Sequence, residues 1–218
     1  MGAGARAILF DFDGTLARTM EDNLNAWRAA VSPHGLDIGP EDYYPLEGLQ
    51  VTEVAKRFCA RLPAGAAEPE ELVRRKEEHY LAHHRFILYP GVEPLLARLR
   101  EHRILIGVVT AGLLDRLQQS APPGFLEQFD AIVTGEDTAD GKPSPVPYLR
   151  GAQKLGVRPQ ECIVVENAPL GIASAKRAGA YCIALCTTLP QDALAGADEI
   201  VGSFEDLAGC DAIKRLLA

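Results

Sequence analysis

The chain has 218 residues and a formal net charge of −8, with 47% hydrophobic and 24% charged residues. These proportions are typical of a soluble globular protein, and the length allows one large domain or a core with a smaller satellite. The acidic balance argues against a nucleic-acid surface, and no apolar run approaches the roughly 20 residues that a membrane-spanning helix needs. Residues 1–6 do not resemble a secretory signal, so we expect a cytoplasmic protein with neither membrane nor nucleic-acid partners.

Turn residues and hydrophobic periodicity first give one strand and then a helical segment. The apolar run at residues 6–10 is typical of a buried strand in a parallel sheet. Apolar residues at helical spacing predict helices over 19–31, 51–62 and 68–86, and we expect Trp27 to lie in the core of this segment. Residues 17–88 are therefore expected to be wholly helical.

After Pro90-Gly91, predicted strands alternate with predicted helices. Strands are expected at residues 104–109, 131–134, 162–165, 181–186 and 199–201. Helices are expected at residues 92–102, 113–120, 146–155 and 170–178. This alternation predicts an α/β fold with a Rossmann-like, doubly wound parallel sheet. We expect residues 1–16 and 89–218 to form this core, and residues 17–88 to form an inserted all-helical domain.

Two carboxylates directly follow the first strand. Asp11 and Asp13 stand at i and i+2 before a Gly14-Thr15 turn, where parallel sheets gather their reactive groups. Ionised carboxylates this close repel each other unless a cation or a proton lies between them. The stretch therefore predicts a metal site or an acid/base pair. A plain turn with an Asx hydrogen bond is the structural alternative.

Polar groups also follow the next predicted strand and lie in a later loop. Thr110 comes after the strand at 104–109, and Ala111 and Gly112 leave backbone N–H groups open to an anion. Lys142 stands before Pro143 in a rigid loop that leads into a helix. The structural alternatives are a helix N-cap for Thr110 and a solvated loop cation for Lys142.

The strand at 162–165 ends in Glu166 and Asn167, just before a helix. An acidic group there could serve only the helix dipole. However, the four strand-end segments together resemble, in order and residue type, the four motifs of the haloacid dehalogenase (HAD) superfamily. The resemblance covers nearly the whole chain. Residues 17–88 resemble the helical cap of the branch that contains β-phosphoglucomutase and phosphoglycolate phosphatase.

The resemblance implies a phosphatase that works through an aspartyl-phosphate. Asp11 would attack phosphorus, and Asp13 would protonate the leaving alkoxide and then deprotonate the attacking water. Thr110 and Lys142 would complete the catalytic set by neutralising the phosphoryl oxygens. Dehalogenases lack the second carboxylate, so Asp13 favours phosphate esters as substrates.

The resemblance also implies Mg²⁺, held by Asp11, Asp13 through its carbonyl, Glu166 and Asn167. Many relatives have Asp at the position of Asn167. The amide can still bind a metal ion or a metal-bound water, but one charge is missing, so we expect weaker metal binding.

Substrate-binding groups are expected on both parts of the chain. On the core they are Thr110, Ala111, Gly112 and Lys142, and on the cap Asn23, Gly48 and Lys76. A mutase would have His in place of Asn23 and a phosphate-binding Arg in place of Val51, so hydrolysis is favoured over isomerisation.

Two alternatives stay open beside the phosphatase. One is a sugar-phosphate mutase like β-phosphoglucomutase, and the other is a catalytically weak regulator that binds a phosphometabolite or a protein. The expected partner is a small phosphorylated metabolite, and the expected state is a monomer or weak homo-oligomer.

Other suggestive residues are interpreted as structural. His79 and His83 lie four residues apart, but a zinc-protease Glu is missing, so a solvated helix face is favoured. Arg74, Arg75 and Lys76 are expected to form a solvated basic cluster. All five cysteines are expected to be reduced thiols because their number is odd and no Cys-x-x-Cys occurs. They are Cys59, Cys162, Cys182, Cys186 and Cys210.

Overall fold

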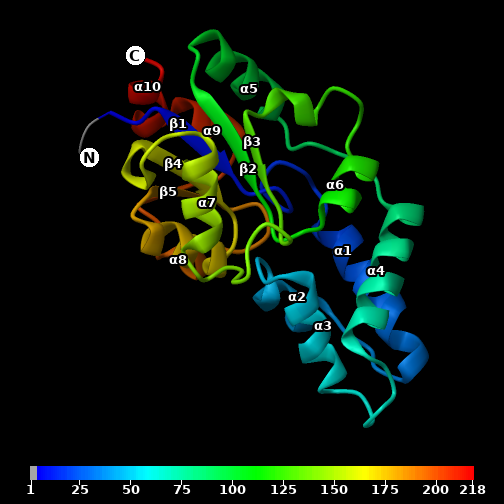
Figure 1. Cartoon of the computed structure of the whole chain (residues 1–218). Coiled ribbons are helices and arrows are strands. Elements are labelled where there is room, and N and C mark those ends of the chain that lie inside the picture. Colours follow the sequence, from blue (N-terminus) through cyan, green and yellow to red (C-terminus); the bar gives the residue numbers. More distant parts are fainter. Residues whose placement is uncertain (1–3) are drawn as a thin grey trace.

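The computed structural model describes residues 4–218 (Figure 1). Residues 1–3, part of the stretch expected not to be a secretory signal, lie outside the described residues. Six parallel strands form one sheet in the order β3-β2-β1-β4-β5-β6. They are β1 (Ala7–Phe10), β2 (Leu105–Val109), β3 (Ala131–Val133), β4 (Cys162–Glu166), β5 (Tyr181–Leu185) and β6 (Glu199–Val201). The predicted doubly wound parallel sheet is confirmed.

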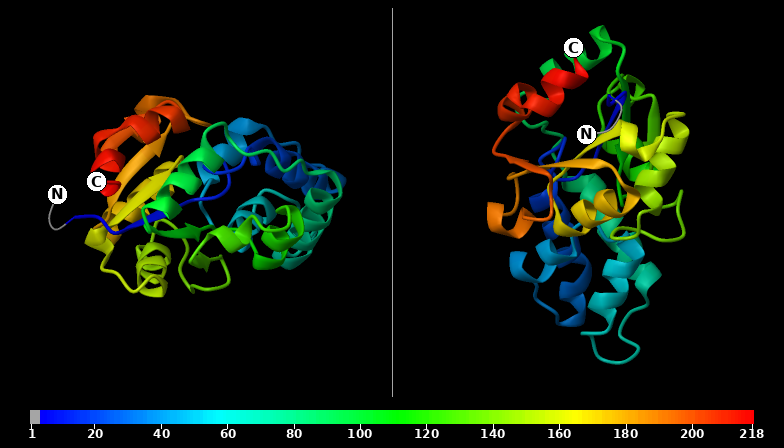
Figure 2. Two further views of the ribbon diagram at one scale, coloured as in Figure 1. Left: turned by 90° about the horizontal axis from the view of Figure 1, so that it is seen from above. Right: turned by 90° about the vertical axis from the view of Figure 1, so that its left-hand side faces the viewer.

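Helices cover both faces of this sheet (Figure 2). Ile8 and Phe10 of β1 pack into the core on one face, and Ala7 and Leu9 pack into the core on the other, as the two-residue period of a strand requires. The first face is covered by α5 (Val92–Glu101), α9 (Phe204–Gly209) and α10 (Asp211–Leu216). The second face is covered by α7 (Val146–Lys154) and α8 (Pro169–Ala178). A further helix, α6 (Leu114–Ser120), follows β2.

The inserted segment forms a helical cap beyond the sheet (Figures 1 and 2). Its helices are α1 (Met20–Val31), α2 (Pro40–Tyr43), α3 (Val51–Cys59) and α4 (Pro69–His83). They pack around Trp27, which is buried as predicted and contacts the Phe58 ring edge-on at 5.4 Å between centroids. An α/β core with a helical cap is therefore confirmed.

The two connecting segments that join the cap to the core run side by side. The Arg18 N–H donates to the Ile87 carbonyl at 2.8 Å, and the Tyr89 N–H donates to the Leu16 carbonyl at 3.0 Å. Entry and exit therefore share one narrow connection.

Element boundaries differ from the predictions mainly in the cap. The helix predicted over 51–62 ends at Cys59, and that predicted over 68–86 runs from Pro69 to His83 because the chain turns extended at His84. The short helices α2, α9 and α10 were not predicted, nor were five 3₁₀ turns. These are Ser32–His34, Tyr44–Leu46, Leu126–Gln128, Pro159–Glu161 and Gln191–Leu194.

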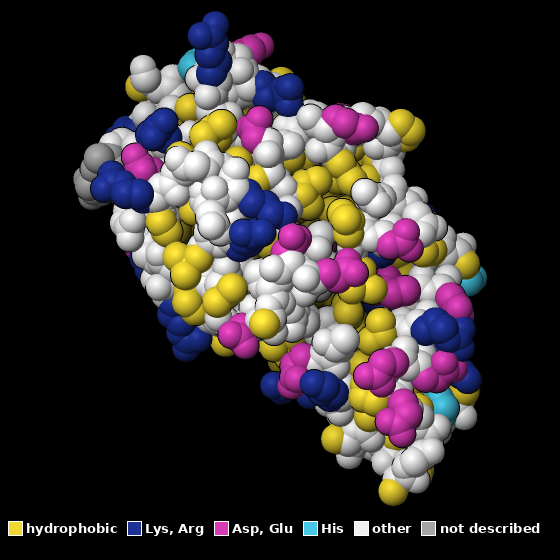
Figure 3. Space-filling model, viewed as in Figure 1, with side chains coloured by type: hydrophobic (Ala, Val, Ile, Leu, Met, Phe, Trp, Pro, Cys, Tyr) yellow, Lys and Arg dark blue, Asp and Glu magenta, His cyan; other side chains and the backbone are white. Residues whose placement is uncertain are grey.

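The structural interpretations of the sequence hold for most residues concerned. All five cysteines are free thiols. Arg74 and Arg75 form ion pairs with Glu71 on the outer face of α4, and acidic and basic side chains are interspersed on the face shown in Figure 3. The prediction that Lys76 belongs to a solvated cluster is wrong. Lys76 is only 1% exposed, because its position on the helix faces the core. No helix within residues 4–218 is long and apolar enough to cross a membrane.

Candidate active site

The carboxyl ends of the central strands bring the predicted residues to one edge of the sheet. Phe10 pairs in register with Val108 of β2 and with Val165 of β4, so the segments that follow these strands emerge together. The N–H of Asp11 donates to the Val165 carbonyl at 2.9 Å and extends the pairing by one residue. β1 lies where the chain reverses its direction of crossing, which is the usual ligand site of an open α/β sheet.

Lys142 lies at the centre of this edge and is 2% exposed. Its Nζ is 2.6 Å from Asp11 Oδ1 and 2.6 Å from Glu166 Oε1, and it also donates to the Val109 carbonyl at 3.1 Å. All three ammonium donors are therefore used. The Tyr148 hydroxyl donates to Glu166 Oε1 at 2.7 Å. Lys142 is a buried cation that joins two carboxylates, rather than a solvated loop residue.

The charges of this cluster shift one another. Burial raises the pKa of Asp11 to about 7, and the nearby Glu166 carboxylate adds to the rise although the Lys142 ammonium opposes it. Burial alone would lower the pKa of Lys142, but Asp11 and Glu166 outweigh it and raise that pKa above its ordinary value. Lys142 therefore keeps its charge, and the site holds more negative charge than one ammonium neutralises.

Asp13 has a different set of partners. Its Oδ1 accepts hydrogen bonds from Thr19 Oγ1 at 2.7 Å and Asn23 Nδ2 at 3.1 Å. Arg116 of α6 donates to both oxygens, from Nη1 at 3.1 Å and from Nη2 at 2.6 Å. Burial alone would raise the pKa of Asp13, but the Arg116 guanidinium holds it well below its usual range. Two carboxylates two residues apart are thus shifted in opposite directions because their neighbours differ, and Asp13 stays ionised while Arg116 is bound to it.

Small groups complete the wall between Asp13 and α6. Thr110 Oγ1 lies 3.5 Å from Asp13 Oδ2 and accepts the Gly112 N–H at 3.0 Å. A Cβ on Gly112 would collide with the Arg116 guanidinium, so a larger residue there would displace Arg116 from its present position.

A cavity of about 40 Å³ lies between these core groups and the cap. It is lined by every predicted site residue except Lys142, which instead binds two of the lining carboxylates. The predicted residues on the lining are Asp11, Asp13, Asn23, Gly48, Lys76, Thr110, Ala111, Gly112, Glu166 and Asn167. The structure therefore brings the whole predicted set together.

Asn167 is fully buried, and both ends of its amide are bound. Its Oδ1 accepts from Thr15 Oγ1 at 2.9 Å, and its Nδ2 donates to Thr188 Oγ1 at 2.9 Å and to Glu47 Oε1. Glu47 belongs to the cap and is 5% exposed. Burial, reinforced by the nearby Asp11 and other carboxylates, raises the pKa of Glu47 well above its ordinary value. A carboxylate from the cap thus enters the core site beside the amide.

The donor chemistry of this place suits a hard divalent cation. The carboxylates of Asp11, Glu166 and Glu47 line this cavity, while Asn167 turns its amide nitrogen toward Glu47 and its oxygen toward Thr15. Mg²⁺ takes few protein oxygens and completes its shell with water and phosphate. Among residues 4–218, no three His, Cys, Asp or Glu side chains form a ready-made metal cage.

Three charged residues at the site were not predicted. Arg116 lies near the start of α6 and is 2% exposed, and Glu77 of the cap helix α4 lies 3.7 Å from its Nε. Glu47 directly precedes Gly48. The only sequence signals for them were an arginine soon after Thr110-Ala111-Gly112 and an acid next to a predicted glycine, and both are weak.

Comparisons with known proteins agree with this geometry. A sequence model of the haloacid dehalogenase-like hydrolase family matches residues 8–185. The chain belongs to this family. It is 31% identical to the validoxylamine A 7'-phosphate phosphatase of Streptomyces hygroscopicus subsp. limoneus over 93% of this chain and 95% of that protein. It is 28% identical to the β-phosphoglucomutase of Bacillus subtilis (strain 168) over 93% and 91% of the two chains.

A solved structure of CbbY from Rhodobacter sphaeroides in complex with phosphate superposes with a TM-score of 0.84. It is 29% identical in sequence, and the match covers 96% of this chain and 99% of that one. The predicted superfamily is therefore confirmed, and the prediction of a HAD-type phosphatase is confirmed at the level of the family.

Proposed function

We propose that the chain hydrolyses a small phosphorylated metabolite, a phosphate monoester, through transient phosphorylation of Asp11 and with Mg²⁺ as cofactor. The observation that carries the proposal is the meeting of Asp11, Glu166 and Lys142 at one buried strand edge, beside Thr110 on the lining of the same cavity. A relative named as a validoxylamine A 7'-phosphate phosphatase and a structural neighbour solved in complex with phosphate support it.

Asp11 is the nucleophile in this proposal. One of its oxygens attacks phosphorus, and the bond from phosphorus to the ester oxygen breaks. Once Arg116 has released it, Asp13 can carry a proton, which it gives to that oxygen as it leaves. Asp13 then takes a proton from the water that attacks the aspartyl-phosphate. Lys142, Thr110 and the N–H groups of Ala111 and Gly112 hold the phosphoryl oxygens and offset their charge, and for this the Gly112 N–H exchanges Thr110 Oγ1 for the substrate.

Asp11, the Asp13 carbonyl, Glu166 and Asn167 would hold Mg²⁺, which offsets the negative charge of the phosphoryl group when bound. We further propose that Glu47 joins this set from the cap. Asn167 carries no charge, and its amide binds Glu47 directly, so the cap carboxylate supplies the charge that an Asp at position 167 would bring. Metal binding would then favour the closed cap.

The cap is proposed to move as one unit of residues 17–88 on the core of residues 1–16 and 89–218. The paired connections near Ala17-Arg18 and residues 88–91 would act as the hinge. Opening would admit the substrate, and closing would exclude water from the aspartyl-phosphate until it is needed. A cytoplasmic location and a monomeric or weakly oligomeric state stay predictions.

The test is a screen for phosphate release from sugar phosphates, phosphoglycolate and nucleotides, with and without Mg²⁺. We expect Mg²⁺-dependent release from at least one ester, and a loss of at least about 10³-fold in kcat for Asp11→Asn. Asp115→Asn, at an exposed carboxylate on α6, is the matched control and should keep wild-type rates. Wild-type rates in Asp11→Asn would overturn the nucleophile assignment.

The same screen separates the alternatives. A hexose 1-phosphate with a trace of bisphosphate would yield an isomer rather than phosphate if the chain were a mutase. Tight binding of one metabolite without any turnover would indicate a regulator.

A further inference from the structure

Two buried cations face the cavity from opposite sides of the junction between cap and core. Lys76 of α4 is 1% exposed and Arg116 of α6 is 2% exposed. Both lie against the Tyr80 ring, with Lys76 Nζ at 5.1 Å and Arg116 Cζ at 4.8 Å from its centroid. Both cations also line the cavity that contains Asp11.

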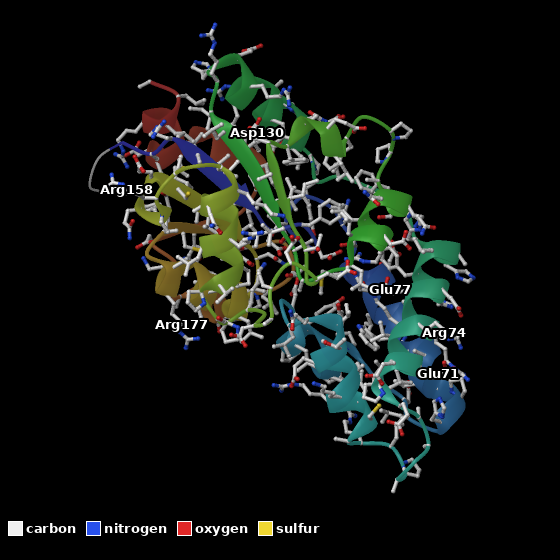
Figure 4. The ribbon with its side chains drawn as sticks, in the orientation of Figure 1. Glu71, Arg74, Glu77, Asp130, Arg158 and Arg177 are labelled. Atoms are coloured by element: carbon white, nitrogen blue, oxygen red, sulfur yellow. The ribbon has the colours of Figure 1, made fainter. Side chains whose placement is uncertain are left out.

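Glu77 lies between the two cations but forms a hydrogen bond with only one of them, Lys76. Its Oε1 binds Lys76 Nζ at 3.0 Å, while its Oε2 lies 3.7 Å from Arg116 Nε, beyond hydrogen-bond distance. These two facing atoms, Glu77 Oε2 and Arg116 Nε, are buried and have no hydrogen-bond partner. Figure 4 shows Glu77 on the part of α4 nearest α6, while Glu71 lies farther along the helix from the core. Buried polar atoms are rarely left without a partner, so each one needs an explanation.

The hydrogen bonds that Arg116 forms with Asp13 would also block the proposed role of Asp13. Its guanidinium occupies both carboxylate oxygens of Asp13. In the proposed function, Asp13 must present an oxygen to the leaving group. Arg116 therefore has to exchange Asp13 for another anion when the substrate binds.

We propose that Lys76 and Arg116 form a second anion site, and that the preferred substrate is a compact phosphate monoester whose leaving group carries a second anionic group, a phosphate or a carboxylate. This inference rests on the proposed function and names its substrate class. The second anion takes Arg116 from Asp13 and leaves Asp13 facing the ester oxygen. An uncharged leaving group offers Arg116 no anion in place of Asp13, so Arg116 stays bound to Asp13.

The chemistry of the two cations suits this ligand. The planar guanidinium of Arg116 binds carboxylate or phosphate through two parallel hydrogen bonds. Lys76 adds a point charge on the same side of the cavity. In a buried site such charge-assisted bonds are strong because little water competes with them. Both cations line the same cavity as Asp11, so the two anionic groups of the substrate would lie close together, hence the expectation of a compact molecule.

The test compares substrates that differ only in the second charge. Ethylene glycol bisphosphate and phosphoglycolate carry a second phosphate and a carboxylate, and 2-hydroxyethyl phosphate carries a neutral hydroxyl in the same place. For the wild type, we expect kcat/KM to be at least about 10-fold higher for a charged member than for the hydroxyl compound. The charged member with the larger ratio identifies the second group.

The variants Arg116→Gln and Lys76→Gln should each reduce this ratio at least about 5-fold, mainly through KM of the charged substrates. Arg74→Gln, at an exposed arginine of the same cap helix, is the matched control and should keep the wild-type ratio. A wild-type ratio near one, or an unchanged ratio in both variants, would overturn the proposal. Because the ratio compares substrates on one protein, a uniform loss of activity does not count as support.

A binding measurement separates this inference from the proposed function. The same three compounds are titrated calorimetrically into Asp11→Asn, which is not expected to turn over. Tighter binding of a charged compound that is lost in Asp11→Asn with Arg116→Gln supports the second anion site, even if the wild type releases no phosphate. Equal affinity for all three compounds would contradict the site, even if the wild type hydrolyses phosphate esters.

Discussion

Charged side chains reach one cavity from two regions, the strand ends of the core and the junction between core and cap. The two regions differ in whether these side chains have all of their hydrogen-bond partners. At the strand ends, Lys142 uses all of its donors on Asp11, Glu166 and a backbone carbonyl. At the junction, Arg116 Nε and Glu77 Oε2 face each other without a hydrogen bond. In the first region the central cation has all of its hydrogen bonds, whereas in the second a buried donor and a buried acceptor face each other without one.

This difference suggests a division of labour. Attack on a phosphoryl group needs the same charges for every ester, so the core can hold them in a fixed arrangement. Leaving groups differ, so the groups that select among them lie where the cap meets the core.

The strongest way to break the comparison is to remove the cation at the strand ends. Lys142→Met leaves Asp11 and Glu166 buried without their partner, which should cost about 3–5 kcal/mol of unfolding free energy. It should also reduce kcat at least about 10³-fold because the phosphoryl oxygens lose their nearest cation. Chemical denaturation and phosphate release measure the two effects. Lys154→Met, at a partly exposed lysine, is the control and should change neither greatly.

A substitution at Glu47 tests whether the cap completes the metal site. Glu47→Gln keeps the shape but removes the charge beside Asn167, and we expect about 10- to 100-fold weaker Mg²⁺ binding by calorimetry. Glu41→Gln, at an exposed position of α2, should bind Mg²⁺ like the wild type. If Glu47→Gln also binds like the wild type, Glu47 is not a metal ligand.

The smallest expected effect, at the junction, is a pH dependence of the unfolding free energy that comes from Lys76. Burial, with the nearby Arg116 charge, lowers the pKa of Lys76 from 10.5 to about 8. Between these values the unfolded chain binds more protons than the folded one, so the contribution of Lys76 to the unfolding free energy increases with pH. Relative to Lys76→Met, the wild type should gain about 2 kcal/mol between about pH 8 and pH 10.

Urea unfolding across this pH range measures the difference. Lys56→Met, at an exposed lysine of α3, should show no such trend relative to the wild type. A constant difference between wild type and Lys76→Met would show that Lys76 is not destabilised by its burial.

The core and its chemistry could largely be predicted from the sequence, for a physical reason. Each strand is an apolar run that ends in turn residues, and parallel strands deliver whatever follows them to one edge. Asp11, Thr110 and Glu166 therefore had to meet once the sheet was predicted. Short helices such as α9 and α10 were missed because six residues give fewer than two turns of periodicity.

The junction could not be predicted in the same way. Whether Lys76 faces solvent or the core depends on how α4 is rotated against α6, and its neighbours Arg74 and Arg75 face outward. Glu47 reaches Asn167 only because the cap is closed over the core. Local sequence carries little information about such contacts, since they depend on how two separately folded parts dock.

The central claim is that Asp11 carries the phosphoryl group during turnover. Its most direct test is rapid acid quenching of the wild-type enzyme with Mg²⁺ and a hydrolysed ester, followed by reductive trapping and mass spectrometry of the peptides. The account predicts a modified side chain at position 11 that is missing in Asp11→Asn. Steady phosphate release with Asp11 unmodified, or with the phosphoryl group trapped on another residue, would contradict it.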